Sequence, residues 1–172
     1  MSKNPYAVAM FTIAKEDNHL LEAKESFDIF IDFWNNNEEF RKVLLAPNIP
    51  LENKKAIVKA SFKDLYLDFQ YFLAVVLDNH KERKLSEIYN SFIELFREHE
   101  KILVVNITSS KELTAKEEAH FLQIFSKKYA SYEIVLEKKV DPSLLAGYRF
   151  LINGKELDLS LQNELASLKE GL

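Results

Sequence analysis

The chain contains no cysteine and only three glycines among its 172 residues. The lack of cysteine excludes disulfides, thiol catalysis and cysteine-ligated metal. The glycines are Gly147, Gly154 and Gly171, all in the last part of the chain. Loops that cradle phosphates need several glycines close together. The sequence therefore offers no glycine-rich nucleotide-binding loop.

Long apolar runs are also missing. The longest extends from Tyr71 to Leu77, far short of the ~20 residues that cross a bilayer. The first residues show neither a signal pattern nor an Arg-rich transit pattern. The net charge is −4, which argues against a nucleic-acid-binding domain. We therefore expect a soluble protein that reaches a membrane only through a partner.

Hydrophobic residues make up 47% of the chain and include 13 Phe, enough to bury a core. Up to residue 101 these residues recur at helical spacing. The breaks between helices coincide with Asn-rich and Pro-containing segments. The pattern predicts six helices, over residues 6–15, 19–35, 38–46, 52–62, 65–78 and 85–101.

The pattern changes at Ile102, where a β-branched, alternating segment predicts a strand over residues 102–108. Thr114 and Glu117 have the spacing of a capping box, which predicts a helix that ends near Tyr129. Asn153-Gly154 is a strong hairpin signal. We expect further strands over residues 132–140, 148–152 and 155–158, followed by a helix over residues 160–169.

The predicted fold is therefore α+β. It consists of an N-terminal six-helix bundle over residues 1–101 and a small mixed β-α-β-β-α domain over residues 102–172.

No catalytic constellation emerges from the sequence. The four histidines lie on separate elements without the i, i+4 spacing of a helical metal site. No serine lies in a G-x-S-x-G elbow. The carboxylates lie at helix starts and on polar faces, where their spacing suggests no acid–base pair. We predict no catalytic residue, no metal site and no cofactor.

Two predicted helices carry more apolar surface than one core contact needs. On each, a second apolar face lies beside or opposite the expected core face. These second faces comprise Tyr6, Ala9 and Ile13 in the first helix and Leu67, Tyr71 and Val75 in the fifth. One explanation is burial between neighbouring helices of the bundle. The other is a groove that receives a partner's helix.

Three segments resemble the delta subunit of bacterial F-type ATP synthases and its mitochondrial counterpart, the oligomycin-sensitivity-conferring protein. Residues 6–11 are similar to a Y-A-x-A-[LF]-F opening. Residues 72–88 resemble the family's apolar helix, polar loop and helix start. Residues 140–147 resemble V-D-P-S-L-[IL]-[GA]-G, and Asn153-Gly154 and residues 157–160 follow in the family's order.

The resemblance implies a non-catalytic stator subunit on the cytoplasmic face of the cell membrane. Such a protein links the alpha-beta head to the peripheral stalk, so that proton-driven rotation is coupled to ATP synthesis. The resemblance also implies that the N-terminal helix of the alpha subunit binds between the first and fifth helices. The residues expected to bind it are Tyr6, Ala9, Ile13, Leu67, Tyr71 and Val75.

The C-terminal domain is similar to the part of the family that holds the C-terminal end of the b subunit. Its expected structural motif comprises Asp141, Pro142, Gly147, Asp158 and Ser160. Other functions stay open: a member of a specialised rotary-ATPase-like complex, an enzyme with its site between the two domains, or a nucleic-acid-binding adaptor.

Overall fold

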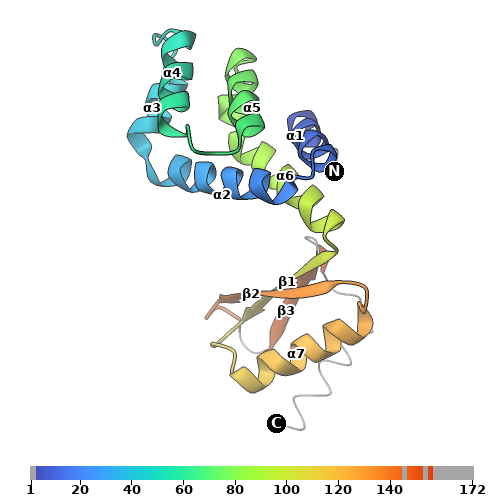
Figure 1. The fold of residues 1–172 in the computed structure, drawn as a ribbon. Helices are drawn as coiled ribbons and strands as arrows, with labels where there is room; N and C mark the ends of the chain where they lie inside the picture. The colour runs from blue at the N-terminus through green and yellow to red at the C-terminus, as the bar shows by residue number, and fades with distance from the viewer. Residues whose placement is uncertain (1–2, 145–146, 153–154, 157–172) are drawn as a thin grey trace. The chain divides into compact units, whose positions relative to one another are not determined.

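The structure is a computed structural model that describes residues 3–144, 147–152 and 155–156 (Figure 1). The chain divides into two compact units, Met1–Phe96 and Arg97–Leu172. The division falls after Phe96 rather than after Lys101. Within the second unit, Arg97 Nη2 lies 3.3 Å from Glu137 Oε1, so the last turn of its helix belongs with the sheet.

Within the described residues, six α-helices lie between Pro5 and His99. A short 3-10 turn, η1 (Glu82–Lys84), precedes the last of them. Their positions confirm the predicted helices, with differences of a few residues at the ends, where boundaries are least certain. The six are α1 (Pro5–Glu16), α2 (Leu20–Asn36), α3 (Glu38–Leu45), α4 (Leu51–Ser61), α5 (Leu67–Asp78) and α6 (Leu85–His99).

Side-chain caps fix where α1 and α3 begin. The Asn4 carboxamide oxygen accepts the Tyr6 N–H at 3.1 Å, and Pro5 occupies the first helical position, where no N–H is needed. Asn37 caps α3 in the same way through the Phe40 N–H at 2.9 Å. The Asn4 Nδ2 also donates to Glu87 Oε1 of α6 at 2.9 Å, which attaches the start of α1 to α6.

An aromatic cluster forms the core of the helical unit. Phe27 of α2 is fully buried, and its ring centroid lies 5.0–5.7 Å from those of Phe69, Phe72, Tyr89 and Phe92. These neighbours come from α5 and α6. Edge-on and tilted ring pairs at such distances add to the hydrophobic stabilisation. The cluster therefore fixes which face of α5 points inward.

A buried ion pair that the sequence pattern did not indicate joins α4 to η1. Lys54 Nζ lies 3.5 Å from Glu82 Oε1, and both side chains are almost fully buried. Removal of one partner would leave an uncompensated buried charge. The pair therefore holds the start of α4 against the segment that follows α5.

The second unit contains a mixed sheet. Its elements are β1 (Ile102–Ser109), α7 (Ala115–Lys128), β2 (Glu133–Val140), β3 (Tyr148–Ile152) and β4 (Lys155–Glu156). The strand order is β2-β1-β3-β4, with β1 parallel to β2 and antiparallel to β3. A parallel pair needs a crossover connection, and α7 provides it. The observed architecture is α+β, as predicted.

The predicted hairpin is confirmed by the antiparallel pairing of β3 with β4, in which Ile152 lies opposite Lys155. Asn153-Gly154, Asp158, Ser160 and the predicted helix over residues 160–169 lie outside the described residues. No helix in the described ranges is both long and apolar enough to span a membrane.

The Asp-Pro-Ser segment forms a turn after β2. The Asp141 carboxylate accepts the Ser143 hydroxyl at 2.6 Å and the Ser143 N–H at 3.0 Å, and these bonds lower the pKa of Asp141. The Asp141 N–H donates to the Ser109 carbonyl at 2.8 Å. Pro142 is exposed, and Gly147 has a φ of 97°, which favours glycine. The motif therefore ties the end of β2 to the end of β1.

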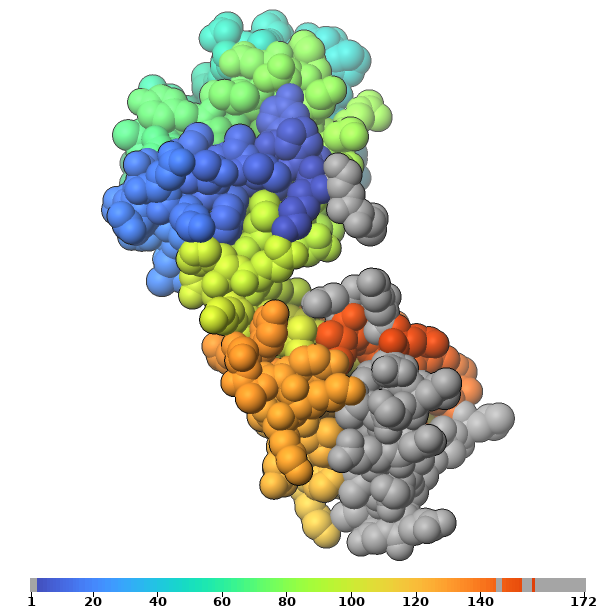
Figure 2. All heavy atoms as spheres, turned by 90° about the vertical axis from the view of Figure 1, so that its right-hand side faces the viewer, coloured from blue at the N-terminus to red at the C-terminus, as the bar shows by residue number. Residues whose placement is uncertain are grey.

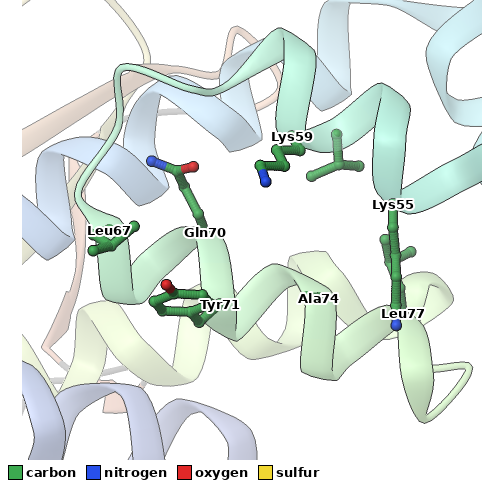
Figure 3. Close-up of a pocket in the computed structure, with 8 residues that line it drawn as sticks. Lys55, Lys59, Leu67, Gln70, Tyr71, Ala74 and Leu77 are labelled. Carbon is green, nitrogen blue, oxygen red and sulfur yellow. The ribbon is translucent and has the colours of Figure 1, made fainter. Parts of the chain in front are cut away.

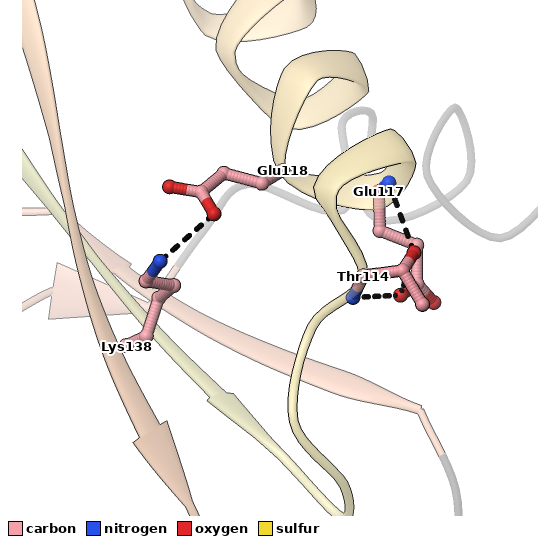
Figure 4. Close-up of polar contacts among 4 residues, drawn as sticks. All are labelled: Thr114, Glu117, Glu118 and Lys138. Carbon is pink, nitrogen blue, oxygen red and sulfur yellow. Dashed lines mark hydrogen bonds and ion pairs between the residues drawn. The ribbon is translucent and has the colours of Figure 1, made fainter.

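The predicted capping box at the start of α7 is present (Figure 4). The Thr114 hydroxyl oxygen accepts the Glu117 N–H at 3.3 Å, and Glu117 Oε2 accepts the Thr114 N–H at 2.7 Å. The Tyr148 hydroxyl of β3 donates to Glu117 Oε1. The bonds from Tyr148 and Thr114 lower the pKa of Glu117. Nearby, Lys138 Nζ lies 2.8 Å from Glu118 Oε2.

Replacement of Phe27 by Ala tests the aromatic core. We expect a loss of about 3–5 kcal/mol in the free energy of unfolding, because the cavity removes contacts to four rings. Urea unfolding of the helical unit can be followed by the fluorescence of Trp34, the single tryptophan of the chain. Leu21→Ala on the same helix is the control. Its side chain is 58% exposed, and we expect a change within about 0.5 kcal/mol. Equal losses for the two variants would contradict the assignment.

Replacement of Glu117 by Gln tests the capping box. A carboxylate with a lowered folded-state pKa contributes stability above its unfolded pKa of about 4.3, and this contribution is lost as the pH falls through the folded value. Gln can still close the capping box, so the variant removes only the negative charge near the start of α7; we expect a cost of about 0.3–1 kcal/mol at pH 7 and a smaller loss of stability on acidification. Amide hydrogen exchange of β1 and α7 between neutral and acidic pH measures both effects. An unchanged pH dependence would contradict this role.

Candidate partner-docking surface

The two faces of α5 have opposite environments although both are apolar. The inward face, with Phe69, Leu73 and Val76, is buried. On the outward face Leu67, Tyr71 and Val75 are 56%, 61% and 48% exposed. These three side chains recur at i, i+4 and i+8, so they form one stripe along the helix. The outward face is therefore open.

The first helix shows the same division. Ala7, Met10 and Ala14 are buried, whereas Ile13 is 47% exposed. Ala9 is exposed and Tyr6 is half-buried. Burial among neighbouring helices, the simpler explanation of the second apolar face, does not account for these positions.

The two open faces belong to neighbouring helices. The α1 and α5 helices pack against each other, and Figure 2 shows α1, in dark blue, beside the green atoms of the α4–α5 region. We call the six predicted positions together the docking face. Its residues are Tyr6, Ala9, Ile13, Leu67, Tyr71 and Val75.

A hollow that the sequence did not indicate lies on the other side of α5. It has a volume of about 280 Å³ and lies between α4 and α5 (Figure 3). Leu67 and Tyr71 border it as well as the docking face. Its other lining residues are Lys55, Val58, Lys59, Gln70, Ala74 and Leu77.

Both aspartates of α5 have a polar partner. Lys55 Nζ lies 2.5 Å from Asp78 Oδ1, and this bond raises the pKa of Lys55. At the start of α5 the Tyr66 hydroxyl donates to Asp68 Oδ2 at 2.8 Å. Burial and this bond raise the pKa of Tyr66 to about 12, so the hydroxyl stays neutral. An exposed apolar stripe with few charged side chains is suited to binding another protein.

The described residues contain no cluster of three or more His, Asp or Glu side chains that could hold a metal ion. The perturbed groups are themselves structural, since Glu117 caps α7 and Asp141 closes a turn.

Comparison with known proteins agrees with the resemblance in the motifs. The family described as ATP synthase delta (OSCP) subunit matches residues 3–172. ATP synthase subunit delta of Desulforudis audaxviator is 29% identical, over 97% of this chain and 92% of that protein. The Geobacillus sp. subunit delta is 28% identical, over 97% of this chain and 94% of that protein.

Among solved structures, a chain of the Toxoplasma gondii mitochondrial ATP synthase hexamer superposes with a TM-score of 0.74 at 18% identity. The match covers 96% of this chain and 94% of that chain, and it shows a shared fold. Because the family match extends over nearly the whole sequence, the chain belongs to the ATP synthase delta (OSCP) subunit family.

Proposed function

We propose that the chain joins the catalytic head of ATP synthase to its peripheral stalk through two separate surfaces. As a member of the delta (OSCP) family, it is a stator component of the F-type ATP synthase. In this proposal the docking face of the helical bundle binds the N-terminal helix of the alpha subunit. The second unit binds the C-terminal end of the b subunit.

The open apolar stripe of α5 is the observation that carries this proposal. Leu67, Tyr71 and Val75 lie within nine residues, and the helix rises about 12 Å from the first to the last at 1.5 Å per residue. An amphipathic partner helix with apolar side chains at i, i+4 and i+7 matches such a stripe. Full burial of a large apolar side chain contributes about 1.5–3 kcal/mol, although part of this gain offsets the entropic cost of association.

The proposed role is mechanical. Rotation of the central shaft exerts torque on the alpha-beta ring, and the head turns idly unless a stator resists that torque. In this role the protein performs no chemical step and holds two partners at once. The aromatic core around Phe27 supports it, because it keeps α5 from rotating about its axis and hiding the outward stripe. We place the protein at the cytoplasmic face of the membrane, held there by its partners.

Charge placed on the stripe tests the docking face. We expect Tyr71→Asp and Val75→Asp each to weaken binding of a synthetic peptide of the alpha subunit's N-terminus by at least about tenfold, because a carboxylate would be desolvated at the interface. Isothermal titration calorimetry measures the affinity, and circular dichroism verifies the fold. Leu21→Asp, at an exposed position on α2, is the matched control. Undiminished binding with an intact fold would place the alpha site elsewhere.

The two surfaces are expected to act independently. The Tyr71→Asp variant should bind the alpha peptide weakly or not at all. It should keep wild-type affinity for a peptide from the C-terminal end of the b subunit, because binding of the b subunit is assigned to the second unit. Sequential titration of the two ligands into the full chain measures both affinities. If Tyr71→Asp also abolished binding of the b peptide in a folded variant, the division of roles between the units would be wrong.

A further inference from the structure

The hollow between α4 and α5 has an apolar interior and a rim of two lysines. Val58 and Leu77 are buried, and Ala74 is half-buried. Lys55 and Lys59 lie one turn apart on α4 and border the opening (Figure 3). A cavity of about 150 Å³ lined by apolar side chains is enough to bind benzene. The α4–α5 hollow, at about 280 Å³, therefore has room for a leucine or phenylalanine side chain.

The two rim lysines differ in their partners. Lys55 is paired with Asp78 and lies 3.8 Å from Glu52 Oε1. Lys59 is exposed and forms no ion pair with any carboxylate of the described residues. It can therefore accept a carboxylate from another chain without breaking a pair that the structure describes.

The side-chain amide of Gln70, on the α5 side of the hollow, already donates hydrogen bonds within the chain. Gln70 Nε2 donates to the carbonyls of Leu65 at 2.7 Å and Lys63 at 3.1 Å. These bonds fix the Gln70 side chain against the α4–α5 connection. The hollow thus has a fixed wall, an apolar floor and, at its rim, a cation that pairs with none of the described carboxylates.

We propose that α4 extends the binding surface beyond the docking face and that the α4–α5 hollow determines which helix can bind. A large apolar side chain of the docked helix enters between Tyr71 and Val58, and a carboxylate one turn away on that helix pairs with Lys59. The occupant is therefore an amphipathic helix with an acidic residue three or four positions from a bulky apolar one. This inference rests on the proposed function.

One helix can reach both sides of α5. A helix with its side chains is about 10–12 Å across, and Leu67 and Tyr71 border both the docking face and the hollow. A helix that lies along these two residues can extend side chains toward Ile13 on one side and Lys59 on the other. The α4 contact adds charge complementarity, which favours correct partners over others.

Two variants test the α4 contact with the alpha N-terminal peptide as the probe and the full chain as the receptor. Ala74→Trp fills the hollow without removing a core side chain, and we expect binding at least about tenfold weaker. Lys59→Glu reverses the rim charge and should weaken binding about fivefold at low ionic strength, with a smaller difference at high salt. Lys59→Arg, which keeps the charge, should retain most of the affinity.

Lys116→Glu provides the matched control, because it makes the same change of net charge at an exposed lysine of the second unit. Its affinity should stay within about twofold of wild type. Trp34 fluorescence and circular dichroism verify the fold of each variant. Should Ala74→Trp fail to fold, the exposed Lys59 position still decides the question.

The outcomes separate the inference from the proposed function. If the wild-type chain does not bind the peptide, both the proposed function and the α4 contact are contradicted. If it binds, and Tyr71→Asp weakens it while Ala74→Trp and Lys59→Glu do not, the docking face stands and the α4 contact is overturned. Loss of affinity in Lys116→Glu equal to that in Lys59→Glu would also overturn the α4 contact, because a non-specific charge effect would explain both.

Discussion

Phe27 of α2 contacts four aromatic rings, two from α5 and two from α6, and the arrangement of the helical unit depends on this packing. In an amphipathic helix, the position of the apolar face determines which side is buried. Because α5 is apolar on both faces, its hydrophobic pattern alone does not determine which side packs inward. The rings of Phe69 and Phe72 determine it, because they fit against Phe27 and the outward side chains are smaller or carry a hydroxyl. The exposure of Tyr71 is thus a result of what is buried opposite it.

Much of the fold could be predicted from sequence because its signals are local. Asn37 before Glu38-Glu39, the Thr114–Glu117 spacing and the Asn153-Gly154 pair each depend on residues within a few positions of one another. The order of the strands could not be predicted in this way. The β1 strand pairs with both β2 and β3. Contacts between segments distant in the chain decide this pairing, and the periodicity of the sequence carries no information about them.

The docking face and the α4 hollow show the same limit. A second apolar face on one helix is visible in a helical pattern, so the residues of α1 and α5 could be named in advance. Whether neighbouring helices cover such a face depends on packing, and two explanations were equally compatible with the sequence. The α4 side of the hollow could not be predicted, because nothing in the sequence distinguishes Lys55 and Lys59 from the other lysines of the chain. Their role at the rim depends on the packing of α4 against α5. The buried Lys54–Glu82 ion pair could not be predicted either, because it too depends on contacts between segments distant in the chain.

The position of β1 in its sheet has a consequence for how the second unit bears tension. The chain passes from His99, the last residue of α6, to Ile102, the first of β1, so a pull along the backbone arrives at this strand. The strand is bonded on both edges, to β2 from Ile102 to Ser109 and to β3 from Val105 to Ser109. Sliding it lengthwise would shear both ladders together, whereas an edge strand could be peeled away one bond at a time. A pull directed along β1 would therefore load its hydrogen bonds to both neighbouring strands at the same time.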